Sequence, residues 1–147
     1  MRVDFYQLTR DPPQLVLPAI AQNIVQLNKK LLVLSDLENV PILSKSLWSY
    51  RDDSFLAHGI AGEGDDSIQP ILLSDKMDND NAAEMIAICD GVWREEALSF
   101  ERCFFMFNPE QTDSARALWK ELVAVEQTQL HYWKQEGAKW VEGPSKK

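Results

Sequence analysis

The sequence has few of the residues that build metal sites or disulfides. It contains two cysteines and two histidines in 147 residues, and none of them stands at a CxxC or HxxxH spacing. Cys89 and Cys103 both lie in apolar runs, which predicts two buried thiols in a reducing, cytoplasmic setting. We therefore expect no structural metal and no cofactor.

The sequence also has fewer positively charged residues than negatively charged ones. Lysine and arginine total 15 against 23 aspartates and glutamates, which gives a formal net charge of −8. Direct nucleic-acid binding needs clustered cations that contact phosphates, so we expect this chain to meet DNA only indirectly, through another protein. No apolar run approaches the length of a membrane span, and the opening residues MRVDFYQL do not resemble a signal peptide, so we expect no membrane association.

Glycine is missing where nucleotide binding would need it. A dinucleotide fingerprint requires glycines directly after the first strand, but the residues there are TRDPPQ. Residues 59–64 offer only a GxxGxG spacing, and no GxxxxGK(S/T) or GxSxG motif occurs. The alternative that remains for catalysis is a small α/β enzyme with a nucleotide or metal site near His58 and the 61–64 loop.

The sequence does contain apolar runs that alternate with helical patterns. Continuous apolar runs such as LLVLS suit strands covered on both faces, and a strand–helix–strand order favours parallel pairing. We predict an α/β fold, a three-layer α/β/α sandwich around a mixed, largely parallel sheet with Rossmann-like topology and no nucleotide site. The expected strands are residues 3–8, 31–35, 54–59, 70–74, 85–89 and 101–107, and the expected helices are residues 17–28, 36–47 and 112–127.

Prolines and polar residues mark the ends of these helices. Pro18 suits the first turn of the first helix, and Asn28 suits its C-terminal cap. Asp36 can cap the second helix, where Pro41 is tolerated only in the first turn. These residues predict where the two helices begin and where the first one ends.

The chain reads as one domain over residues 1–142 with a flexible C-terminal tail over residues 143–147. The stretch after the last helix fits two structures. HYWKQ and AKWVE can form a hairpin that turns at Glu136-Gly137, or the same residues can extend the preceding helix.

A basic and aromatic patch stands near the end of this acidic chain. Arg116 and Lys120 are four residues apart on the last expected helix, so they share a face that also includes Trp119. Lys134 and Lys139 follow in the aromatic C-terminal stretch. Such a patch can hold a short acidic peptide with an apolar end, although ordinary solvation of a helix gives the same spacing.

Three separated stretches of the sequence resemble the chi subunits of bacterial DNA polymerase III. The first is an opening strand with F-Y-x-L, and the second is a helix ending in LW, a charged turn, S-F-x-x-H, an AGEG loop and an apolar strand. The third is a last helix with A-R-x-x-(W/Y)-K. The residues that carry the resemblance are Phe5, Tyr6, Leu8, Leu47, Trp48, Ser54, Phe55, His58, Ala61–Gly64, Pro70–Leu73, Ala115, Arg116, Trp119 and Lys120.

The resemblance implies a non-catalytic adaptor in the clamp-loader assembly, monomeric by itself. Its expected partners are the acidic C-terminal tail of single-stranded DNA-binding protein, which ends in an apolar aromatic residue, and the psi subunit where one exists. The resemblance assigns tail binding to Asn108, Arg116, Trp119 and Lys120, and a psi-side interface to Leu47, Trp48 and Phe55. A second basic position that the family has near the start of the last helix is Thr112 here.

Overall fold

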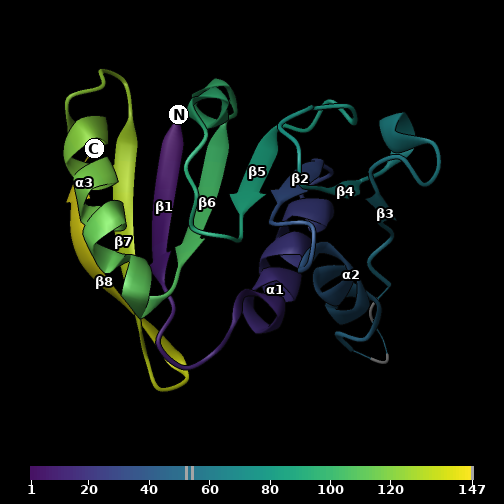
Figure 1. Ribbon diagram of the computed structural model, residues 1–147, viewed down its shortest axis with the longest axis horizontal. Coiled ribbons are helices and arrows are strands. Elements are labelled where there is room, and N and C mark those ends of the chain that lie inside the picture. Colours follow the sequence, from purple (N-terminus) through teal and green to yellow (C-terminus); the bar gives the residue numbers. More distant parts are fainter. Residues whose placement is uncertain (52, 54, 147) are drawn as a thin grey trace.

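The computed structural model describes residues 1–51, 53 and 55–146. It confirms the α/β fold: one eight-stranded sheet with helices on both faces (Figure 1). No helix within these residues is long and apolar enough to cross a membrane. The elements in chain order are β1 (Arg2–Gln7), α1 (Pro13–Gln26), β2 (Leu31–Leu34), α2 (Val40–Trp48), β3 (Gly59–Ile60), η1 (Asp66–Ile68), β4 (Ile71–Ser74), β5 (Met85–Ile88), η2 (Glu95–Ser99), β6 (Arg102–Phe107), η3 (Pro109–Gln111), α3 (Thr112–Val123), β7 (Gln129–Glu136) and β8 (Lys139–Lys146).

The sheet is parallel except at one end, as the sequence predicts. Its strand order is β3-β4-β2-β5-β6-β1-β7-β8, and among the strands of the described residues only the β7–β8 pair is antiparallel. β1 lies between β6 and β7 and pairs in parallel with both. The crossover from β6 to β7 is α3, which therefore lies across the first strand of the chain.

Two apolar cores separate the three layers. α1 and α2 pack on one face through residues such as Leu17, Leu43 and Leu47, and α3 packs on the other through Leu118 and Leu122. The central strands β2, β4 and β5 are buried along their whole length, because both of their faces are covered. Figure 1 shows α3 over the end of the sheet that holds β1, β7 and β8.

The sequence predicted the C-terminal end of α1 but not its start. Asn28 adopts a positive φ of 59°, and the amides of Asn28 and Lys29 bond back to Val25 and Ile24, which is a Schellman ending. The expected start is wrong. α1 begins at Pro13, so Pro18 lies inside the helix and not in its first turn, because Pro12 and Pro13 already fix the extended-to-helical entry.

Other boundaries also differ from the sequence prediction. Within the expected strand 54–59 only Gly59 pairs with β4, because residues 55–58 leave the sheet to expose Phe55 and turn His58 inward; Ser54 lies outside the described residues. α2 begins at Val40, one turn after Asp36. α3 ends at Val123 and not near residue 127, and Gln127 has a φ of 60°.

The ambiguous C-terminal stretch is a hairpin, not a helical extension. Glu136 pairs with Lys139 around a turn in which Gly137 has a φ of +61°. β8 runs to Lys146, past residue 142, where the sequence suggested that a flexible tail begins. The Lys146 ammonium donates to the carbonyls of Val123 and Val125, so the end of β8 caps α3.

A glycine after β5 gives a test of this packing. Gly91 has a φ of +71°, and a Cβ there would overlap the side-chain amide of Gln111, which is held by bonds to the Asn108 amide and the Asp90 carbonyl. We predict that Gly91→Ala lowers the free energy of unfolding by roughly 2–3 kcal/mol, because backbone strain and steric overlap add. Urea unfolding measures the change.

Gly137→Ala is the matched control, since Gly137 also has a positive φ but open space around it. It should cost only the backbone strain, about 1 kcal/mol. Equal losses in the two variants would contradict the close approach of Gly91 to Gln111.

Candidate functional site

A groove between α3 and the β7–β8 hairpin brings together most of the residues that the sequence assigned to peptide binding. Its volume is about 510 Å³. Arg116, Trp119 and Lys120 line it from α3, as the i, i+4 spacing predicted. The other lining residues come from β1 and from the hairpin: Gln7, Tyr132, Lys134, Glu136, Val141, Glu142, Gly143 and Pro144.

Aromatic rings form the floor of this groove. The Trp119 and Tyr132 rings lie 5.9 Å apart, and both contact Phe5, at centroid distances of 5.2 and 6.2 Å. Phe5 is fully buried, and the Tyr132 hydroxyl donates to Gln7 Oε1 at 2.6 Å. Burial raises the pKa of Tyr132, and the nearby Arg116 opposes that shift. The floor is therefore apolar, fixed, and close to a guanidinium.

Three cations around the groove are free of internal partners. Arg116, Lys120 and Lys134 are exposed, and none of them forms a hydrogen bond or an ion pair with another described side chain. The two acids of the lining differ: Glu142 binds Nδ1 of His131 at 2.9 Å, whereas Glu136 has no cation partner in the described part of the chain. The groove is thus locally basic on a chain with a net charge of −8.

Asn108 lies apart from this groove. Its side chain accepts from the Gln111 amide while the Gln111 side chain accepts from the Asn108 amide, a capping box that starts η3, the 3-10 turn directly before α3. Asn108 lines a different cavity, and Thr112, whose hydroxyl donates to Pro109, does not line the groove either. The structure therefore does not place Asn108 with Arg116, Trp119 and Lys120.

A second candidate surface carries two large exposed aromatic residues. Trp48 is 51% exposed and Phe55 77% exposed, and their rings lie 5.6 Å apart. Leu47, which the resemblance assigned to the same surface, is 1% exposed and packs in the α1–α2 core, so its side chain does not lie on this surface. Adjacent helical residues point about 100° apart, so Leu47 faces the core where Trp48 faces outward.

The side chain of His58 packs against Trp48 of this aromatic pair. It is 8% exposed and lies 4.2 Å from the Trp48 ring. Nδ1 bonds to the Leu56 carbonyl and Nε2 to the Ser44 hydroxyl, each at 2.8 Å, so Nδ1 carries the proton and Nε2 accepts. Burial lowers the pKa of His58. Both ring nitrogens are occupied, which fits the structural role that the sequence suggested.

The loop beside His58 is a poor phosphate or metal site. The cavity there is lined by Glu63 and Asp66, and the Gly62 amide already donates to the Asp66 carboxylate. Carboxylates in these positions repel a phosphate. Among the residues that the structure describes, no three His, Cys, Asp or Glu side chains gather as a possible metal site.

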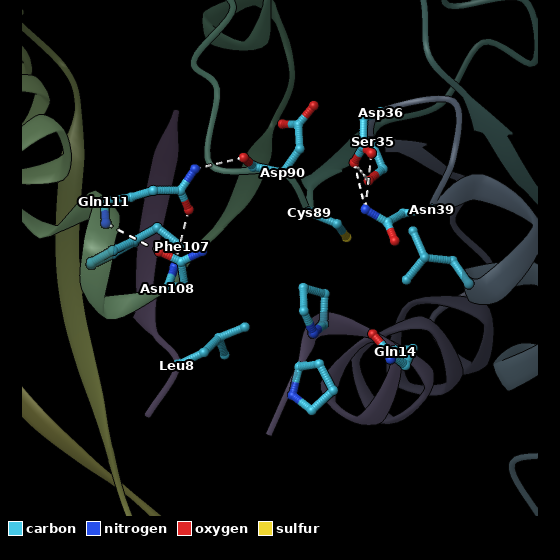
Figure 2. A pocket seen from close by; sticks show the side chains of 13 residues that line it. Leu8, Gln14, Ser35, Asp36, Asn39, Cys89, Asp90, Phe107, Asn108 and Gln111 are labelled. Atoms are coloured by element: carbon cyan, nitrogen blue, oxygen red, sulfur yellow. Dashed lines mark hydrogen bonds between the residues drawn. The ribbon is translucent and has the colours of Figure 1, made fainter. Parts of the chain in front are cut away.

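The sheet also has a cavity where doubly wound folds commonly bind ligands. It lies beyond the carboxyl ends of β1, β2, β5 and β6, next to Leu8, Ser35, Cys89 and Asn108, and its volume is about 330 Å³ (Figure 2). No lysine or arginine is in its lining. Pro12 and Pro13 remove backbone N–H donors at the start of α1, so the cavity has no phosphate cradle.

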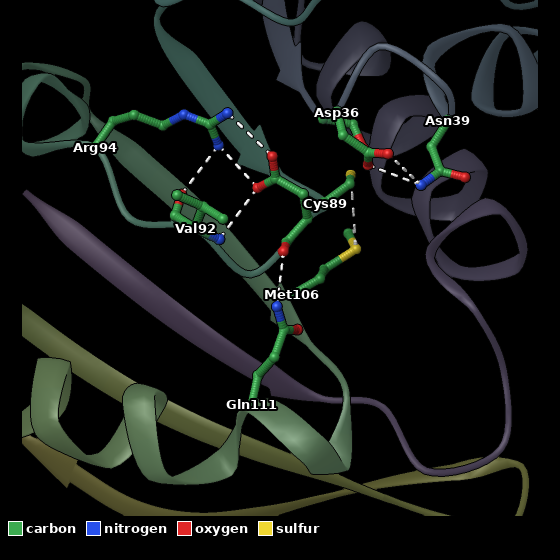
Figure 3. Close-up of polar contacts among 9 residues, drawn as sticks. Asp36, Asn39, Cys89, Val92, Arg94, Met106 and Gln111 are labelled. Atoms are coloured by element: carbon green, nitrogen blue, oxygen red, sulfur yellow. Dashed lines mark hydrogen bonds and ion pairs between the residues drawn. The ribbon is translucent and has the colours of Figure 1, made fainter.

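Several polar groups of that cavity already have partners within the protein (Figure 3). The Asp90 carboxylate accepts two bonds from Arg94 at 2.8 and 3.0 Å, and Asn39 donates to the Asp36 carboxylate, which lowers the Asp36 pKa. Cys89 and Cys103 are free, buried thiols, and burial raises the pKa of both. These contacts stabilise the strand ends and do not support a nucleotide or nucleophile site.

Sequence reasoning named Lys134 and gave the hairpin as one of two possible structures, but it did not place Tyr132 and Glu136 in the groove. Tyr132, Lys134 and Glu136 alternate along β7 and line the same side. The alternation is visible in QLHYWKQE, but parallel pairing of β7 with β1 is a long-range contact that local spacing does not reveal.

Two comparisons with known proteins point to one family. A family model described as "DNA polymerase III chi subunit, HolC" matches residues 1–129. A protein of Rickettsia prowazekii (strain Madrid E), named "Probable DNA polymerase III subunit chi", is 30% identical over 60 residues. That alignment covers 41% of this chain and 36% of the relative, so it spans about a third of the relative's length.

The burial of His58 makes the stability of the fold depend on pH. Because burial disfavours the charged ring in the folded state, the unfolded chain binds more protons once the pH falls below the ordinary histidine pKa of 6.5. We predict that the free energy of unfolding decreases from pH 7 to pH 5, and that His58→Gln flattens this slope. Urea unfolding followed by tryptophan fluorescence measures it; an unchanged slope in the variant would contradict the role.

Proposed function

This chain belongs to the family of DNA polymerase III chi subunits, and we propose that it is a non-catalytic adaptor in the cytoplasm. It links the clamp-loader assembly to single-stranded DNA-binding protein by holding that protein's acidic C-terminal tail. The observation that carries the proposal is the groove of α3 and the hairpin, where unpaired cations surround an aromatic floor.

The chemistry of such a tail matches the groove. An acidic peptide that ends in an apolar aromatic residue presents carboxylates beside a ring. Arg116 can bind a carboxylate with two parallel hydrogen bonds, and Lys120 adds a point charge on the same helix face. Trp119 and Tyr132 offer ring edges and faces to an apolar group. Each part of the peptide thus meets a partner of the right kind.

Charge placement explains how an acidic chain can bind an acidic peptide. The net charge of −8 acts at long range, where salt screens it beyond about 8 Å at physiological ionic strength. The cations of the groove act at contact, where screening is weaker. We infer that recognition depends on these few local charges, so that removing one of them has a large effect.

The surface of Trp48 and Phe55 is the proposed docking site for a psi subunit. Large exposed aromatic side chains that lie side by side are the usual anchors of protein interfaces. The surface lies next to α2, whereas the groove lies on α3, on the opposite face of the sheet. The two partners can therefore bind at the same time, which is what an adaptor requires.

The geometry of the described residues does not support the alternative proposal of a small enzyme. His58 uses both ring nitrogens in internal bonds, and the adjacent 61–64 loop faces carboxylates. No specific observation favours it.

The tail-binding role is tested by calorimetric titration with a peptide that copies the acidic C-terminus of single-stranded DNA-binding protein. We expect Arg116→Ala to weaken binding roughly tenfold or more, about 1.4 kcal/mol, because a charge-assisted pair is lost. Binding by the unmodified protein should also weaken as salt rises.

Lys45→Ala on α2 is the matched control, since it removes an exposed cation outside the groove. It should bind like the unmodified protein. Full affinity in Arg116→Ala would place the peptide elsewhere on the molecule.

The psi-docking role needs a separate variant. We expect Phe55→Ser to weaken binding of a purified psi subunit roughly tenfold or more, because an interface anchor is removed, and to leave peptide affinity unchanged. Leu37→Ser, at another exposed apolar residue, should keep psi binding. Co-elution in size-exclusion chromatography and titration measure both, and psi binding that survives Phe55→Ser refutes this surface.

A further inference from the structure

We propose that the β7–β8 hairpin is the second half of the peptide site, with Lys134 as the cation that faces α3 across the groove. This inference rests on the proposed tail-binding function. It adds a specific residue and a specific wall that lie beyond residue 129, where the match to the family model stops.

The position of Lys134 follows from its strand. It pairs in parallel register with Gln7 of β1, and Gln7 holds the Tyr132 hydroxyl. Tyr132 and Lys134 are two residues apart on β7, so both project on the α3 side of the sheet. Lys134 therefore lies beside the aromatic floor, in the groove that Arg116 also lines, exposed and without an ion pair in the described residues.

The wall around Lys134 is held firmly. On the opposite face of β7, the buried Gln135 side chain accepts from the amides of Thr9, Arg10 and Asp11 at 3.0–3.2 Å. At the far end of the hairpin, Lys146 caps the last carbonyls of α3. A wall fixed at both ends loses little conformational entropy when a peptide binds, which favours affinity.

The charges of the hairpin also give the site a direction. Glu136 follows Lys134 by two residues and lines the same groove without a cation partner in the part of the chain described. An acidic peptide is attracted at Lys134 and repelled at Glu136. We infer that the carboxylates of the peptide lie between Lys134 and α3, and that Glu136 limits how far they extend along the hairpin.

The test compares two variants that change the net charge equally. Lys134→Ala removes a cation in the groove, whereas Lys139→Ala removes an exposed cation from the same hairpin outside it. With the acidic peptide as the probe, we expect roughly a three- to tenfold loss of affinity for Lys134→Ala and little change for Lys139→Ala. The salt dependence should also be shallower in Lys134→Ala, because one charge contact fewer is screened.

Glu136→Gln completes the series, and it should bind the peptide roughly twofold or more tightly, because a repulsion is removed. Circular dichroism of each variant checks that the fold is kept. Equal affinities for Lys134→Ala and Lys139→Ala, with binding still lost in Arg116→Ala, would overturn the hairpin inference while the proposed function stands. Absence of binding by the unmodified protein would overturn both.

The alternative ligand for the groove is a second copy of this chain. Sedimentation at increasing protein concentration detects it. A dimer that Lys134→Ala abolishes, in protein that does not bind the peptide, would assign the groove to self-association and overturn the inference.

Discussion

The candidate site depends on the packing of the buried Phe5 side chain. Its ring lies at the centre of an aromatic cluster and touches Phe105 and Phe107 of β6, Trp119 of α3 and Tyr132 of β7. β1 can place one side chain against all of these elements because it pairs with both β6 and β7 and α3 crosses over it. The groove floor is the outer surface of this cluster, so its shape is set by core packing and not by a loop.

The groove gathers three cations that have no ion pair among the described residues around one aromatic floor, whereas other such cations, Lys45 and Lys139, stand outside it. On the opposite face of the sheet, Arg2 and Arg102 both bind the buried Asp4; although burial alone raises the pKa of Asp4, these contacts and a Trp133 bond hold it below its ordinary value. Ion pairs likewise occupy Arg10, Lys29 and Arg94. The groove cations have no such partners in the described chain, so their charge is available to a ligand. A site for an acidic peptide can therefore exist on an acidic protein.

Local patterns predicted the layers, most strands and the Arg116–Trp119–Lys120 face, because each depends on spacing within one element. Two residues that the resemblance assigned to binding have other roles in the structure, and the hairpin side of the groove depends on a strand far away in the sequence. Leu47 is adjacent to Trp48 in sequence but faces the core, and the Asn108 side chain caps η3. Lys134 joins the groove only because β7 pairs with β1, more than a hundred residues earlier.

Indole N–H signals offer the most direct measurement, because the five tryptophans report on different parts of the molecule. Trp119 lies in the groove, and Trp48 lies on the aromatic surface next to α2. In an NMR titration of ¹⁵N-labelled protein with the acidic peptide, we expect the Trp119 signal to shift with saturation and the Trp48 signal to stay in place. A saturable shift of Trp48 with an unmoved Trp119 would contradict the account.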